Sequence, residues 1–98
     1  MTVQQHALIT HQVGLHARPS VKFTKLAKTF ASRIEIATAE DGPWIDAKSI
    51  VKVMAMKVPE GATLFIRADG DDETLAASAL AALVARDFDE DAKHAGAA

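Results

Sequence analysis

The chain has 98 residues, of which 49% are hydrophobic and 24% charged, with a formal net charge of −2 and no cysteine. The length and composition fit one ordinary globular domain. The absence of cysteine excludes disulfides and thiolate metal sites. The net negative charge argues against nucleic-acid binding, because proteins that bind nucleic acids carry a basic stripe or patch. We find no signal-peptide pattern and no apolar run of membrane-spanning length, so we expect a cytoplasmic chain without membrane insertion.

The first half of the chain predicts a strand, a helix and a strand hairpin. A strand is expected over Thr2–Thr10, and apolar residues recurring every three or four positions predict a helix over Ala17–Phe30. The alternating segment Arg33–Ala39 predicts a strand. The turn residues Glu40–Pro43 and the short segment Trp44–Asp46 then predict a returning strand.

The second half predicts a helix, a strand and a longer helix. A short helix is expected over Ser49–Met56, with Ser49 as its N-cap. A strand over Ala62–Ala68 follows, and an alanine-rich segment predicts a helix over Asp72–Phe88. The last ten residues have nothing to bury and are expected to form a flexible tail.

The predicted element order is therefore βαββαβα. Four short strands can form one antiparallel sheet, with three helices covering its single apolar face. We predict an α+β open-faced β-sandwich that spans residues 1–88, with a tail at residues 89–98. At this level the pattern indicates a fold class and no function.

The segment Gly14–Ser20, which reads GLHARPS, carries the chemistry. It places His16 at the start of a predicted helix, with Arg18 two positions later. The first N–H groups of a helix have no intrahelical partner and the dipole is positive there, so this end favours anions. The same field disfavours an imidazolium, and a neutral ring nitrogen of His16 is a nucleophile. These residues alone predict an anion site and leave open whether His16 is phosphorylated.

Two stretches resemble the HPr family, the histidine-containing phosphocarriers of the bacterial phosphoenolpyruvate:sugar phosphotransferase system. Gly14–Pro19 resembles its active-site motif, and Ala47–Met54 resembles its second helix with a regulatory serine. The predicted βαββαβα order is also the HPr topology, and the resemblance covers about residues 2–88. The spacing between the two stretches is a few residues longer than in many relatives, and the extra length falls in Glu40–Pro43, where insertions are tolerated.

The resemblance implies specific roles. His16 would accept a phosphoryl group on Nδ1 from phosphorylated enzyme I and pass it to an EIIA-type domain, as a monomeric carrier rather than an enzyme. Arg18 would stabilise the phosphoryl group, and phosphate contacts are expected from Ala17, Arg18 and Ser20. Ser49 matches the serine that HPr kinase/phosphorylase modifies in some bacteria. No cofactor is expected. A metal held by His11 and His16 is disfavoured, because the chain has no cysteine and no obvious carboxylate ligand beside them.

The helix around Ser49 carries more apolar residues than one buried stripe can hold, so some of them must face water and are available to partners. We expect Val53 and Met56 to lie in the core. By its match to the family, the expected partner-docking surface comprises Val21, Lys25, Lys28, Ile50, Val51, Lys52, Met54 and Lys57. The lysines would steer acidic partners.

Some residues depart from the family pattern. Val13 stands where many members have a polar residue, Met56-Lys57 replaces a glycine-containing stretch, and Ser20 replaces a smaller residue. The alternatives are an α+β anion-binding or protein-interaction module that is never phosphorylated, and an HPr-like carrier that serves a nitrogen-related or dihydroxyacetone kinase branch.

Overall fold

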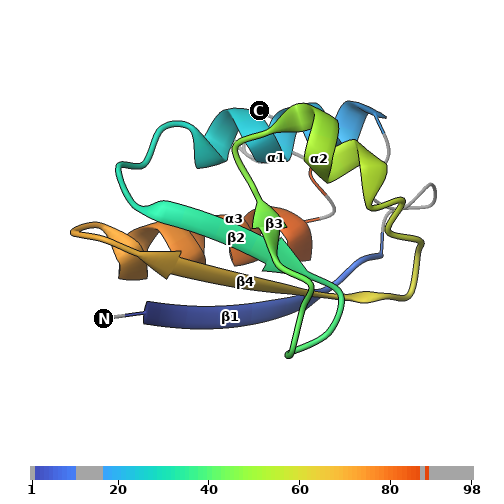
Figure 1. The fold of residues 1–98 in the computed structure, drawn as a ribbon. Helices are drawn as coiled ribbons and strands as arrows, with labels where there is room; N and C mark the ends of the chain where they lie inside the picture. Colours follow the sequence, from blue (N-terminus) through green and yellow to red (C-terminus); the bar gives the residue numbers. More distant parts are fainter. Residues whose placement is uncertain (1, 11–16, 87, 89–98) are drawn as a thin grey trace.

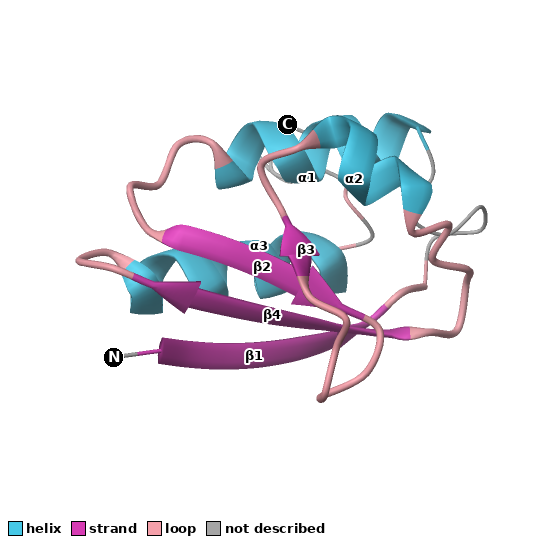
Figure 2. Cartoon of the chain, in the orientation of Figure 1, coloured by secondary structure: helices cyan, strands magenta, loops and turns pink. Residues whose placement is uncertain are grey.

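The computed structural model describes residues 2–10, 17–86 and 88. The elements are β1 (Thr2–Leu8), α1 (Ala17–Ala27), β2 (Arg33–Ala37), β3 (Ile45–Asp46), α2 (Ile50–Ala55), β4 (Thr63–Asp69) and α3 (Glu73–Ala85) (Figures 1 and 2). This order confirms the predicted βαββαβα arrangement and the α+β class.

The four strands form one antiparallel sheet in the order β1-β4-β2-β3. Strand β4 pairs with both β1 and β2, with Leu8 of β1 opposite Thr63 and Ala37 of β2 opposite Phe65. The three helices lie on one side of this sheet and leave the other side open (Figure 1). Burial follows the same division, because Leu64 and Ile66 of β4 are fully buried, whereas Phe65 between them is partly exposed.

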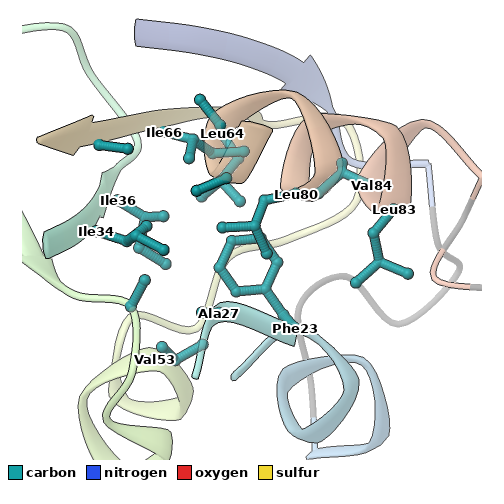
Figure 3. Packing of buried hydrophobic residues seen from close by; sticks show 14 of the residues in the cluster. Phe23, Ala27, Ile34, Ile36, Val53, Leu64, Ile66, Leu80, Leu83 and Val84 are labelled. Atoms are coloured by element: carbon teal, nitrogen blue, oxygen red, sulfur yellow. The ribbon is translucent and has the colours of Figure 1, made fainter. Parts of the chain in front are cut away.

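The core lies between the sheet and the helices and confirms the predicted apolar face. Figure 3 shows Phe23 reaching from α1 towards Leu80 of α3, with Ile36 of β2 nearby. All three side chains are fully buried, as is Val53 of α2. Val53 is therefore a core residue as predicted, and Met56 packs against the same core while partly exposed.

Several predicted element ends are wrong by one to three residues, and local hydrogen bonds explain two of them. Helix α1 ends at Ala27 rather than Phe30, because the chain tightens into i→i−3 hydrogen bonds and the Thr29 hydroxyl donates to the Leu26 carbonyl at 2.6 Å. Helix α3 ends at Ala85 rather than Phe88. The Phe88 N–H donates to the Leu83 carbonyl at 2.9 Å with φ 60°, a helix-ending arrangement.

The strands also differ slightly from expectation. Strand β1 ends at Leu8, although the Ile9 N–H still donates to the Ala62 carbonyl at 2.8 Å. Strand β2 ends at Ala37, two residues before the predicted end, and β4 is shifted by one residue. Trp44 lies just outside β3, and the Arg67 guanidinium stacks 4.1 Å from the centroid of its ring. This contact gives the exposed hairpin a packing partner on the open side of the sheet.

A carboxylate joins two loops at one end of the molecule. Asp72 accepts hydrogen bonds from the Ala31 and Ser32 N–H groups, both at 2.9 Å, and from the Ser32 hydroxyl. Gly70 allows the loops to meet, because a Cβ atom there would lie 2.8 Å from the Ser32 Cα. The hydrogen bond from the Ser32 hydroxyl and that from the Ala31 N–H lower the pKa of Asp72.

Candidate phosphoacceptor site

The predicted acceptor immediately precedes α1. This helix begins at Ala17, as predicted, while His16 and Gly14 lie outside the described residues. Ala17 and Arg18 are exposed, and their N–H groups belong to the first turn, where helical N–H groups have no i−4 acceptor. Pro19 follows, buried and without an N–H group, at a position where none is needed.

Arg18 shares its face of α1 with two further cations. Ala17, Arg18, Val21, Lys22 and Lys25 line a shallow surface hollow. Residues three and four apart lie on one face of a helix, which explains why this spacing gathers them. The first turn of α1 carries no acidic residue. The hollow therefore combines the positive end of the helix with cationic side chains, and it suits an anion.

Lys22 belongs to this site although it was not among the predicted residues. Its Nζ atom donates a hydrogen bond to the Phe88 carbonyl at 3.0 Å and so ties α1 to the chain beyond α3. The i, i+4 spacing from Arg18 is the signal that could have placed Lys22 on this face. Nothing in the sequence pattern indicated the contact with Phe88.

Ser20 lies differently from its neighbours. Its side chain is fully buried, whereas Ala17 and Arg18 are exposed. Burial gives Ser20 a packing role at the start of α1 and places its hydroxyl away from open solvent. A phosphate contact from Ser20 stays a prediction.

Ser49 caps α2 as predicted. Its Oγ atom accepts a hydrogen bond from the Lys52 N–H at 3.3 Å, and the helix begins at the next residue, Ile50. This contact satisfies one of the N–H groups that the first turn leaves free.

The predicted docking residues lie on α1 and α2, which pack together, or within two residues of the ends of these helices (Figure 1). Val51 is 75% exposed, Val21 52% and Met54 40%, while Ile50 is half-buried. The four predicted lysines, Lys25, Lys28, Lys52 and Lys57, are exposed. Apolar and cationic side chains are thus available to a partner, and their role in docking stays a prediction.

Other candidate sites do not coincide with the α1 hollow. A larger open hollow of about 910 Å³ lies beside β3 and α2, where Trp44, Lys52 and Met56 contribute to its lining. In the parts of the chain that the structure describes, no three His, Cys, Asp or Glu side chains are grouped to hold a metal. Within the same parts, no helix is long and apolar enough to cross a membrane.

Comparison with known proteins decides the family. Residues 3–86 match the family described as "PTS HPr component phosphorylation site". The chain belongs to this family. A phosphocarrier protein HPr from Cupriavidus necator is 41% identical over 88 residues, which cover 90% of this chain and 97% of that relative. A phosphocarrier protein NPr from Escherichia coli is 32% identical over 91 residues, covering 93% of this chain and 100% of the relative.

The structural comparison agrees with the family assignment. A crystal structure of HPr from Thermoanaerobacter tengcongensis superimposes with a TM-score of 0.81 at 35% sequence identity, covering 90% of this chain and 97% of the other. The open-faced α+β sandwich is therefore the HPr fold. As a member of the family, the chain is an HPr phosphocarrier of the phosphotransferase system.

Proposed function

We propose that His16 is the phosphoacceptor and that Arg18 stabilises the phosphoryl group. The observation that supports this proposal is that α1 begins at Ala17, the residue that follows His16 in the sequence. Ala17 and Arg18, which follow it in the sequence, are exposed, and charge-assisted hydrogen bonds from a guanidinium such as that of Arg18 are stronger than neutral ones. An acceptor at this position has donors for the charge that it gains.

The transfer step balances without a cofactor. The lone pair of the neutral His16 Nδ1 forms a bond to phosphorus, while the bond between phosphorus and the donor group on enzyme I breaks and the donor keeps that electron pair. The positive helix end and Arg18 then stabilise the phosphoryl oxygens. The reverse sequence delivers the group to an EIIA-type domain, so the chain acts as a carrier and not as an enzyme with its own substrate pocket.

A carrier must bind its phosphoryl donor and then its acceptor. We propose that both partners dock on the surface formed by Val21, Val51 and Met54 with the surrounding lysines. Exposed apolar side chains supply the contact area. Exposed lysines steer acidic partners and raise the association rate at low salt.

We also propose Ser49 as a regulatory phosphorylation site for an HPr kinase. A phosphate on an N-cap residue lies at the positive end of α2, so the helix tolerates it, and its charge alters the neighbouring docking surface. A kinase that modifies the native chain and leaves Ser49→Ala unmodified would support this role. Equal modification of both proteins would contradict it.

The acceptor is tested by incubating the chain with enzyme I and phosphoenolpyruvate, followed by mass spectrometry. We expect one acid-labile, alkali-stable phosphoryl group on the native chain and none on His16→Ala. His6→Ala is the matched control, because His6 is an exposed histidine on β1 that packs against Phe65, and it should accept the group normally. Labelling of His16→Ala equal to that of the native chain would contradict His16 as the acceptor. No labelling of the native chain would favour the unphosphorylated anion-binding alternative.

A further inference from the structure

Phe88, the last residue that the structure describes, lies at the rim of the basic hollow on α1 that Arg18, Lys22 and Lys25 line. Phe88 is 2% exposed, its N–H donates to the Leu83 carbonyl, and its own carbonyl accepts the Lys22 ammonium at 3.0 Å. Lys22 also lines the hollow, together with Arg18 and Lys25. The residue that follows Phe88 is therefore attached directly beside this cluster of cations.

The sequence after Phe88 has the opposite charge. The ten residues that follow Phe88 begin with three acids, Asp89, Glu90 and Asp91. They contain one lysine, Lys93, no arginine, and one histidine, His94, which is positive only when protonated. The hollow offers three cations, and no acidic residue lies in the first turn of α1. The two segments are complementary in charge, and the Lys22–Phe88 contact brings their attachment points together.

Simple dimensions show that the acidic residues can reach the cations. An α-helix rises about 1.5 Å per residue, so Arg18 and Lys25 lie about 10 Å apart along α1, on either side of Lys22. Three extended residues span up to about 10 Å. A segment that starts beside Lys22 can therefore bring carboxylates to both Arg18 and Lys25.

Building on the proposed function, we propose that Asp89–Asp91 docks in the hollow lined by Arg18, Lys22 and Lys25 and competes there with the incoming phosphoryl group and with acidic partners. A tethered segment acts at an effective concentration in the millimolar range, so weak contacts suffice. Carboxylates in the hollow also repel a phosphoryl group that carries about −2 charge. The acidic segment is thus an internal competitor that slows phosphoryl transfer.

The docking is tested in the full-length chain by neutralising the three acids as Asp89→Asn, Glu90→Gln and Asp91→Asn. Backbone amide signals of residues 17–25 are measured by two-dimensional NMR at low salt. We expect these signals to shift, because the carboxylates leave the hollow. The control variant is Glu40→Gln with Asp41→Asn, which neutralises two exposed acids in the β2–β3 turn. Shifts at residues 17–25 no larger than those of the control would overturn the docking.

The competition is tested by the initial rate of phosphoryl transfer from phosphorylated enzyme I. We expect the triple variant to accept the group about two- to tenfold faster than the native chain at low salt, since exposed ion pairs contribute modestly. The difference should fall below about twofold near 1 M salt, where the Debye length is about 3 Å. Equal rates at low salt would overturn the competition even if the amides shift. Failure of both proteins to accept phosphate would contradict the proposed function, while the NMR comparison would still decide the docking.

Discussion

Asp72 connects segments that are far apart in the sequence. Its carboxylate accepts hydrogen bonds from the backbone of Ala31 and from the N–H and hydroxyl of Ser32, 41 and 40 residues away in the sequence. These donors favour the charged form and hold the pKa of Asp72 below its ordinary value. The residue therefore links the stability of the fold to pH.

The lowered pKa of Asp72 determines how its contribution to the free energy of unfolding changes with pH. In the unfolded chain Asp72 titrates at its ordinary pKa, so the charged carboxylate stabilises the fold above that pH. The contribution is lost as the pH falls through the lower pKa of the folded state. We expect Asp72→Asn to lower the free energy of unfolding at pH 7 and to have a smaller effect in strong acid.

Urea unfolding of the native chain and Asp72→Asn, measured from pH 7 downwards, checks this expectation. Asp71→Asn is the matched control, because Asp71 is an exposed neighbour in the same turn. A difference between native chain and Asp72→Asn that stays constant with pH would show that the carboxylate charge is not what stabilises this contact.

At the scale of elements, Ser49 and the helix it caps lead to a second prediction. Ser49→Ala removes the acceptor for the Lys52 N–H, and the loss of an N-cap costs about 0.5–2 kcal/mol. The 3.3 Å distance is long for such a bond, so we expect a value near the low end. Urea denaturation measures it.

Ser78→Ala provides the control for this prediction. Ser78 is exposed within α3, where alanine is the better helix former, so the substitution should leave stability unchanged or slightly raised. If both substitutions have the same effect on the free energy of unfolding, the side chain of Ser49 is not acting as a cap.

The elements also show what the sequence could predict. Periodicity located α1 and β2, because one-sided burial imposes a repeat that can be counted. The N-cap Ser49 and the alanine-rich composition indicated α2 and α3 instead. Their ends could not be predicted, since the Thr29 hydroxyl and the turn at Phe88 end the helices through contacts without a periodic signal. The predicted phosphate contacts of Ala17 and Arg18 stay predictions. Lys22 lines the same hollow, and its i, i+4 spacing from Arg18 could have placed it there, whereas its contact with Phe88, 66 residues away, has no signal in the sequence.

At the scale of the whole molecule, Phe23 belongs to the core that lies between the helices and the sheet. It is fully buried and reaches from α1 towards α3 (Figure 3). Replacement of a buried phenylalanine by alanine costs about 3–5 kcal/mol, because it removes buried apolar surface and leaves a cavity. We expect Phe23→Ala to lose stability of this size, which is a large fraction of the roughly 5–15 kcal/mol that stabilises a typical domain.

Denaturant unfolding of Phe23→Ala and Val51→Ala compares the loss of stability at a core position with that at a position of the docking surface. Val51 is 75% exposed, so its substitution should change stability by less than about 0.5 kcal/mol. A small effect of Phe23→Ala, similar to that of Val51→Ala, would contradict the packing described for the core.

The central claim is that a phosphoryl group enters and leaves the molecule through His16, and a two-stage transfer assay tests it most directly. The chain is first labelled with phosphoenolpyruvate and enzyme I, then separated from both and mixed with an EIIA-type domain. We predict that the native chain and His6→Ala pass the label on, and that His16→Ala passes none. Transfer to the EIIA-type domain by His16→Ala at the native rate would contradict the claim.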